Sequence, residues 1–224
     1  MKKSHDAFNI LVANIAHLDY TDELCKLYEE SAKKRGTGIA KRDPKYIQEK
    51  ILQEKAIIAT TSKNELAGFC YIETWEGKNY VANSGLIVKE EFRKFGLAKR
   101  IKKFVFNYTN TKFPNAKIFG ITTSLAVMKI NSDLGYKPVT FSELTQDDAF
   151  WSGCKSCINY DVLTRTERKN CLCTAMLYDP KQAKEKKFLK AQKIEKKIPA
   201  KLKTPKAQRI KVVKTGGISK VNKK

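Results

Sequence analysis

The sequence predicts an α/β fold with a mixed sheet, built around a strand–helix–strand unit in the middle of the chain. Tyr80–Val88 is rich in β-branched and aromatic residues, as a buried strand is. From Leu97 the apolar period becomes that of one helical face, at residues 97, 101, 104, 105 and 108. A second apolar segment, Lys117–Thr122, follows this helix, and two strands joined in this way form a parallel pair.

The segments before this unit predict a strand, two helices and a hairpin. Residues 8–13 form the first strand, and Gly36 ends a helix over residues 22–34. Asp43 caps a second helix that starts at Pro44 and runs to about residue 54. The segments 56–60 and 66–73 then pair as a hairpin across a polar turn.

The segments after the unit predict a helix, two strands and a tail. The helix covers residues 125–134 and stops at Gly135, and the strands lie at 139–141 and 171–178. Residues 181–224 hold 17 Lys or Arg against 2 Glu. We therefore expect a domain over residues 1–180 and a disordered basic tail over 181–224, with a transient helix at 184–198.

The loop that joins the central strand to its helix predicts an anion-binding site. The first N–H groups of a helix have no intrahelical acceptor and carry the positive end of the helix dipole. Gly96 and Ala98 leave space for a phosphate beside this backbone, and Arg93 and Lys94 add positive charge. The pattern is neither a P-loop nor a three-glycine dinucleotide fingerprint.

This R-x-x-G-x-A loop of Arg93, Gly96 and Ala98 resembles the pyrophosphate-binding motif of the GNAT superfamily of acyl-CoA-dependent N-acyltransferases. The resemblance extends over residues 8–178 and implies a mixed, mostly antiparallel sheet with a central unit that binds coenzyme A (CoA). A stand-alone GNAT type associated with bacterial arginine biosynthesis, which makes an N-acylated glutamate, is similar in the stretches AKKRGTGIAKR, NSGLIV, AVMKINSDLGY and FSELTQDDAFWSGCKSC. The implied CoA-binding residues are Leu86, Ile87, Val88, Arg93, Lys94, Phe95, Gly96, Leu97, Ala98 and Lys99.

The resemblance implies transfer of an acetyl or succinyl group from acyl-CoA to the amine of an amino acid such as glutamate. Two alternatives stay open at this point. The acceptor is a protein lysine or N-terminus, docked by the basic tail through non-specific contacts with an anionic partner, or the chain binds CoA without turnover. A signal peptide and a membrane span are both missing from the sequence, so we expect a cytoplasmic protein. The oligomeric state stays open.

Glu73 and Asn131 are the candidate catalytic residues. Acyl transfer needs a base for the amine, and Glu73, at the end of its strand, is the first candidate; the alternative is a surface turn residue. Many GNATs carry a tyrosine where this chain has Asn131, and that tyrosine protonates the leaving thiolate. An amide has no such proton to give, so Asn131 can only hydrogen-bond to the sulfur or the pantetheine.

Two groups of residues are candidates for binding the acceptor. In GNATs the segment after the first helix borders the acceptor site, and here it contains Arg35, Lys41 and Arg42, which suit carboxylates. The alternative is a solvated loop. Thr122 and Thr123 end a parallel strand, where open α/β sheets bind ligands.

Four of the six cysteines suggest a structural zinc site. Cys154 and Cys157 form a C-x₂-C pair, and Cys171 and Cys173 form a C-x-C pair that a strand would direct to one face. The alternative is that these cysteines are buried apolar filler. A chain of this length does not need a disulfide scaffold.

Overall fold

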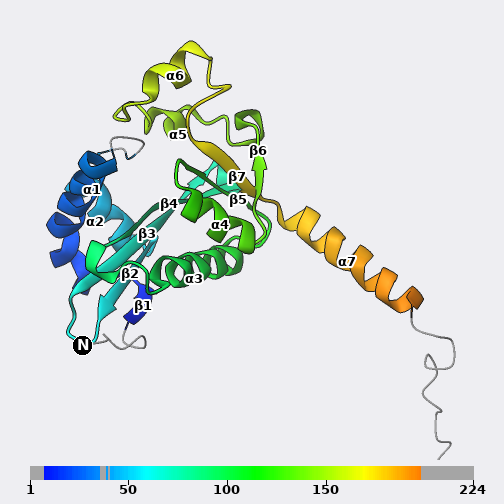
Figure 1. Ribbon diagram of the computed structural model, residues 1–224, viewed down its shortest axis with the longest axis horizontal. Coiled ribbons are helices and arrows are strands. Elements are labelled where there is room, and N and C mark those ends of the chain that lie inside the picture. The colour runs from blue at the N-terminus through cyan, green and yellow to red at the C-terminus, as the bar shows by residue number, and fades with distance from the viewer. Residues whose placement is uncertain (1–7, 36–38, 40, 198–224) are drawn as a thin grey trace, which may run out of the picture. The chain divides into compact units, whose positions relative to one another are not determined.

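The computed structural model of the chain describes residues 8–35, 39 and 41–197 (Figure 1). Its contacts divide the chain into two units, residues 1–184 and 185–224. The strands are β1 (Phe8–Val12), β2 (Ala56–Thr61), β3 (Leu66–Trp75), β4 (Tyr80–Val88), β5 (Lys117–Thr122), β6 (Lys137–Val139) and β7 (Thr174–Tyr178). The helices are α1 (Thr21–Arg35), α2 (Pro44–Leu52), α3 (Leu97–Lys112), α4 (Leu125–Asp133), α5 (Asp148–Ser152), α6 (Tyr160–Arg165) and α7 (Pro180–Lys197).

The seven strands form one sheet in the order β1-β2-β3-β4-β5-β7-β6. Every neighbouring pair is antiparallel except β4 and β5, which are parallel and joined by α3. The predicted mixed, mostly antiparallel sheet around a strand–helix–strand unit is therefore confirmed. The strand predicted at 139–141 lies at Lys137–Val139 instead, because Thr140 and Glu143 form a capping box that turns the chain into a 3₁₀ helix at Phe141–Glu143.

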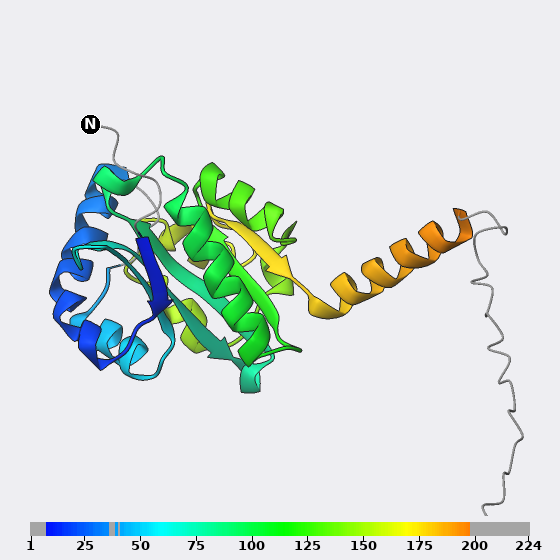
Figure 2. The same cartoon turned by 90° about the horizontal axis from the view of Figure 1, so that it is seen from below.

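Helices cover both faces of the sheet (Figures 1 and 2). Because successive strand residues point to opposite faces, Ile57 and Cys70 pack under α3, whereas Ile58 and Tyr71 pack under α1 and α2. The predicted inner face of α1 is confirmed for Leu24 and Tyr28, both of which are buried. The two faces thus carry separate apolar clusters.

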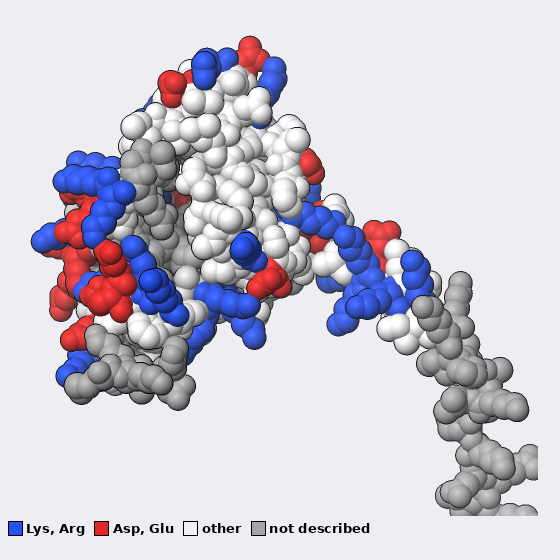
Figure 3. All heavy atoms as spheres, viewed as in Figure 1, with Lys and Arg blue, Asp and Glu red and all other residues white. Residues whose placement is uncertain are grey.

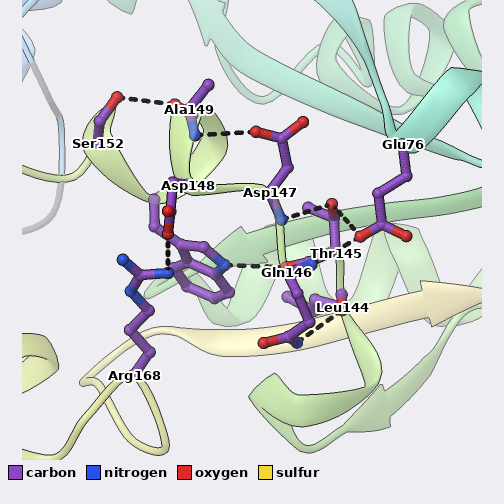
Figure 4. A network of polar contacts seen from close by, with 10 residues as sticks. Glu76, Leu144, Thr145, Gln146, Asp147, Asp148, Ala149, Ser152 and Arg168 are labelled. Carbon is purple, nitrogen blue, oxygen red and sulfur yellow. Dashed lines mark hydrogen bonds and ion pairs between the residues drawn. The ribbon is translucent and has the colours of Figure 1, made fainter.

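Residues 141–173 form an insertion between β6 and β7 that the sequence patterns did not predict as helical. Trp151 of α5 and Leu163 of α6 pack with Phe119 of β5. Figure 4 shows how polar contacts hold the insertion in place. The carboxylate of Glu76 accepts hydrogen bonds from the Thr145 hydroxyl at 2.6 Å and the backbone N–H of residue 146 at 2.7 Å. The insertion is thereby tied to the turn after β3.

Charged side chains are concentrated on α1 and α7. Charged side chains of both signs are exposed on α1, as Figure 3 shows. The helix predicted at 184–198 is present but begins earlier, at Pro180, and its lysines through Lys193 are mostly exposed. Residues 198–224 lie outside the described ranges. Within those ranges, no helix is long and apolar enough to cross a bilayer.

Candidate functional site

The predicted anion-binding loop leads into α3 with an open backbone. Gly96 is the N-cap residue, has φ = 72°, and provides no side-chain cap for the first helical N–H groups. A Cβ atom placed on Gly96 would meet no atom within 4 Å. The Nε atom of Arg93 donates to the backbone oxygen of Val88 at 3.1 Å, so this side chain ties the loop to the end of β4. The loop thus presents amides and open space rather than bulk.

The other predicted CoA-binding residues divide between surface and core. Lys94 is exposed, with φ = 69°. The Nζ atom of Lys99 lies 2.7 Å from a carboxylate oxygen of Asp133, in an exposed ion pair between α3 and α4. Leu97, the first residue of α3, and Val88 at the end of β4 are buried in the same apolar cluster and anchor the two ends of the loop. The remaining members, which are half-buried or line the pocket described next, are Leu86, Ile87, Phe95 and Ala98.

A bulge interrupts β4 near the end that leads into this loop. Between the pairs Phe69–Ile87 and Tyr71–Ser84, one residue of β3, Cys70, opposes two of β4, Gly85 and Leu86. Gly85 lies in the extra turn with φ = 64°, and its backbone oxygen accepts a hydrogen bond from the Tyr28 hydroxyl. A bulge of this kind turns backbone groups out of the ladder and toward a ligand.

Next to the bulge, β4 and β5 separate. Their parallel pairing ends at Ala82 and Phe119, although both strands continue for several residues. A pocket of about 580 Å³ opens there, and its walls reach from α1 and α2 through the gap to α4 and the insertion. The pocket therefore connects the two faces of the sheet beside the bulge.

On the α1 and α2 side, Arg42 lies among aromatic rings in this pocket. Its guanidinium carbon is 5.5 Å from the centroid of the Tyr28 ring and 5.7 Å from that of Tyr71. Burial lowers the pKa of Arg42, but the neighbouring hydroxyl groups of Tyr71 and Tyr28 outweigh this effect and raise it, so the side chain stays cationic. Burial also raises the pKa of Tyr71 to about 12. A fixed cation of this kind suits a carboxylate ligand.

Three of the four other predicted acceptor-binding residues line the same pocket. Lys41 is exposed and lines the same pocket, whereas Arg35 closes α1 at the edge of the described ranges. Residues 36–38 and 40 of the predicted basic loop lie outside those ranges. Thr122 and Thr123 line the pocket at the end of β5, where the Thr122 hydroxyl accepts from the backbone N–H of Ser124 at 3.0 Å.

Glu73 lies in the same pocket, on the face covered by α2. Its carboxylate accepts a hydrogen bond from the Tyr46 hydroxyl and lies 3.4 Å from Nζ of Lys50. The Glu73 side chain is only 15% exposed. Burial raises the pKa of Tyr46, so this hydroxyl keeps its proton. The sequence pattern gave no sign of Tyr28, Tyr46 and Tyr71 as pocket residues, because helix and strand aromatics usually belong to the core.

On the α3 and α4 side, the pocket is lined by buried polar groups. Asn131 is 1% exposed; its Nδ2 lies 3.7 Å from the sulfur of Met176 and its Oδ1 has no partner in the described part of the chain. Lys102, which the sequence did not single out, is 2% exposed and donates to the backbone oxygen of Asn83 at 3.1 Å. Tyr136 is buried and accepts from the Asn83 amide at 3.1 Å, as a core tyrosine does.

The four cysteines of the predicted zinc site line the insertion side of the pocket. Burial raises the pKa of Cys154 to about 11, with smaller contributions from the neighbouring thiols of Cys157 and Cys171. Burial likewise raises the pKa of Cys173 to about 12, with contributions from Cys171 and Cys157. Across the described ranges, no group of three or more His, Cys, Asp or Glu side chains could hold a metal ion. The described residues thus give the zinc site no support, and it stays a prediction. The strand predicted at 171–178 begins later, at Thr174, so the C-x-C pair precedes β7 rather than lying in it.

Three-dimensional comparison identifies the fold. The chain is similar to N-acetylglutamate synthase from Neisseria gonorrhoeae complexed with CoA and N-acetyl-glutamate, at 13% identity and a TM-score of 0.55, over 80% of this chain and 36% of that one. It is similar to a GNAT-family acetyltransferase from Staphylococcus aureus Mu50, at 16% identity and a TM-score of 0.54, over 78% and 99%. The NatC complex bound to a Gag peptide and CoA is similar at 12% identity and a TM-score of 0.54, over 77% and 98%.

These similarities establish the GNAT fold for this chain, as its motif predicts. The chain spans only about a third of the N-acetylglutamate synthase chain. No protein-family model matches the sequence, and no curated protein matches it.

Proposed function

We propose that this chain, which has the GNAT fold, transfers an acetyl or succinyl group from acyl-CoA to the α-amine of a small amino acid such as glutamate. The observation that carries the proposal is that one pocket joins the gap between β4 and β5 to the guanidinium of Arg42. The gap suits the pantetheine of a donor, and the cation suits the carboxylate of an acceptor. Transfer by direct attack in a ternary complex needs both ligands in one cavity.

Binding of the donor is assigned to the start of α3. The uncapped helical N–H groups and the space in front of Gly96 suit a diphosphate, and Lys94 adds charge at the surface. The bulged end of β4 at Leu86–Val88 then supplies a backbone N–H for the oxyanion that forms when the amine attacks the thioester. Acyl-CoA enters as a substrate in this scheme, and no resident cofactor is required.

Activation of the acceptor is assigned to Glu73. The attacking amine must lose a proton, and Glu73 is the carboxylate on the pocket wall closest in sequence to the bulge. The Tyr46 hydroxyl and the Lys50 amine hold it in position. Electron density flows from the amine nitrogen to the thioester carbon, the C–N bond forms, and the C–S bond breaks.

A second function is favoured by the lysine-rich composition of residues 181–224. In this alternative the acceptor is a protein lysine or N-terminus, and the basic segment docks an acidic partner. The peptide-bound NatC complex has the same fold, so the fold is compatible with both kinds of acceptor. A third reading, CoA binding without turnover, is motivated by Asn131.

A screen of acceptors separates these functions. Release of free thiol from acetyl-CoA and succinyl-CoA is measured with glutamate, glutamine, aspartate, lysine and a lysine-containing peptide, and CoA binding is measured by calorimetry. We expect turnover with glutamate and much less with a peptide. Deletion of residues 185–224 leaves glutamate turnover unchanged under the first function and abolishes peptide turnover under the second. Tight CoA binding without thiol release for any amine rejects both enzymatic functions.

The Arg42→Met variant tests the acceptor class within the same screen. The loss of the guanidinium raises KM for glutamate by about 10- to 100-fold, since a charged hydrogen-bond partner contributes about 1.5–3 kcal/mol. Affinity for CoA is unaffected, because Arg42 lies on the opposite face from α3. An Arg42→Met enzyme with an unchanged KM for glutamate contradicts the assignment of a carboxylate-bearing acceptor.

A further inference from the structure

The proposed reaction leaves one buried cation of the pocket unexplained, the ammonium group of Lys102. It reaches from α3 to the backbone oxygen of Asn83, one residue beyond the last paired residue of β4. The parallel pairing of β4 with β5 ends at Ala82, so this oxygen lies beyond the last paired residue. A Cβ atom placed on Gly120 of β5 would lie 3.5 Å from the same oxygen. The ammonium group of Lys102 therefore lies at the point where β4 and β5 separate.

A lysine buried at position 102 lowers the free energy of unfolding compared with an apolar residue. Burial of an ammonium group costs several kcal/mol unless a carboxylate pairs with it. None of the ion pairs found among the described residues includes Lys102. A methionine or leucine would fill the same volume at lower cost. Its ammonium lies 5.8 Å from the centroid of the Tyr136 ring, but no described carboxylate pairs with it. A buried cation without a counter-ion on the wall of a pocket is a feature that function explains better than packing does.

The ionisable groups nearest Lys102 hold their protons more firmly than they do in water. Cys70 of β3 donates its thiol to the Ser84 oxygen at 3.2 Å, and burial raises the pKa of both Cys70 and Tyr136. Asn131 of α4 has no ionisable proton. Burial lowers the pKa of Lys102, opposed by Cys70, and so brings it toward that of an ordinary thiol. Proton transfer is efficient between groups with similar pKa values.

The position of Lys102 also complements that of Glu73. Glu73 contacts α2 on one face of the sheet, and Lys102 belongs to α3 on the other, yet both line the same pocket. An acyl donor that passes between β4 and β5 would present its carbonyl to one face and its sulfur to the other. Base and acid then act on opposite sides of the breaking C–S bond.

We infer that Lys102 is the catalytic acid of the proposed reaction and donates a proton to the sulfur of departing CoA. This inference rests on the proposed function. When the amine attacks, its proton passes to Glu73, and the C–S bonding pair moves to sulfur. Lys102 gives that sulfur a proton and becomes a neutral amine, which the proton from Glu73 restores through solvent. The net reaction converts acyl-CoA and an amine into an amide and free CoA.

Two substitutions test this role. Lys102→Met removes the proton and the hydrogen bond to Asn83, whereas Lys102→Gln keeps a donor for Asn83 and removes only the acid. Lys112→Met is the matched control, since Lys112 is exposed at the end of the same helix and donates to Tyr108. We expect both Lys102 variants to lower kcat by about 100-fold with little change in KM, and the control to leave kcat unchanged. A Gln variant with wild-type kcat overturns the inference.

A second readout does not depend on turnover. CoA labelled with ¹³C at the carbon next to sulfur reports the ionisation of its thiol when bound. A nearby ammonium lowers the pKa of that thiol, so Lys102→Gln raises it by about one to three units relative to the wild type. An unchanged thiol pKa in a variant that still binds CoA, or loss of CoA binding itself, overturns the role of Lys102. If the wild type binds CoA without turnover, the proposed function fails while this measurement still decides where Lys102 lies relative to sulfur.

Discussion

The hydroxyl of Tyr28 on α1 donates a hydrogen bond to the backbone oxygen of Gly85, the bulged residue of β4. This contact joins the helix that borders the acceptor side of the pocket to the strand end that would hold the acyl group. Burial keeps the Tyr28 hydroxyl protonated by raising its pKa well above the ordinary value. The geometry of the bulge is therefore set by the packing of α1 as well as by the strand itself.

Replacing Gly85 with alanine should disrupt this bulge. The added Cβ would lie 2.2 Å from a ring carbon of Tyr71 and 2.7 Å from the Tyr28 hydroxyl, at φ = 64°. Gly77→Ala is the matched control, because Gly77 has φ = 61° and no atom within 4 Å of the added Cβ. We expect urea unfolding to show a loss of about 1 kcal/mol for Gly77→Ala and of about 1–3 kcal/mol more for Gly85→Ala. Equal losses would show that the bulge is not tightly packed.

Two substitutions of Gly96 that differ only in charge test whether the loop binds an anion. Asparagine and aspartate have the same shape and both tolerate the left-handed backbone that Gly96 adopts. Only aspartate places a negative charge before the uncapped amides of α3. We expect Gly96→Asp to weaken CoA binding by about tenfold or more relative to Gly96→Asn, measured by calorimetry. Equal affinities for the two variants would place the diphosphate elsewhere.

The central unit could be predicted because its patterns are strong and local. The bounds of β4 and the first residue of α3 agree with the sequence, since a β-rich run passes directly into a helical stripe across Gly96. The insertion at 141–173 could not be predicted in the same way. Its helices are only five and six residues long, too short for a period to show, and long-range contacts such as that of Glu76 with Thr145 hold them in place.

The candidate site was only partly visible in the sequence for a related reason. Arg42 and Glu73 stand out as charges near segment ends, and both line the pocket. Lys102 is adjacent to the buried Ile101, but a helical lysine normally extends to solvent, so only the separation of β4 from β5 reveals its role. The pocket tyrosines are hidden in the sequence because a buried aromatic residue and a ligand-facing one have the same pattern.

The cysteines of the insertion should be unreactive at moderate pH. The pKa of Cys154 is raised to about 11 and that of Cys173 to about 12, so both thiols are protonated at pH 8. Because the thiolate is the nucleophile, we expect iodoacetamide to modify these two residues at least tenfold more slowly in the folded protein than in urea. Peptide mass spectrometry measures the extent of modification at each cysteine over time. Equal rates in the two states would contradict the burial of these thiols.

The raised pKa values of these two thiols also predict how the free energy of unfolding depends on pH. An unfolded thiol loses its proton near pH 9, whereas the folded one keeps it to about pH 11 at Cys154 and about pH 12 at Cys173. The folded state therefore binds more protons in this window, and the unfolding free energy should fall as pH rises through it. The Cys154→Ala and Cys173→Ala double variant should show a shallower fall between pH 9 and pH 11. An identical slope would show that other groups dominate.

Glu73→Gln tests the base of the proposed reaction. The amide keeps the size of the side chain and a carbonyl that accepts from Tyr46, but it cannot take a proton from the attacking amine. We expect kcat to fall by about 100-fold or more while CoA affinity stays at the wild-type value. Tyr46→Phe serves as the comparison, because it removes one hydrogen bond to Glu73 and leaves the carboxylate, and its effect on kcat should be several-fold at most.

The thermal stability of both variants decides how a loss of activity is interpreted. Lys50 would lose its anionic partner in Glu73→Gln, and the pair is largely buried, so some destabilisation accompanies the substitution. A second substitution, Lys50→Met in the Glu73→Gln background, removes the unpaired charge and should restore stability without restoring kcat. Recovery of kcat together with stability would mean that Glu73 only supports the fold of the pocket, and the base would then have to be a water molecule on the acceptor side.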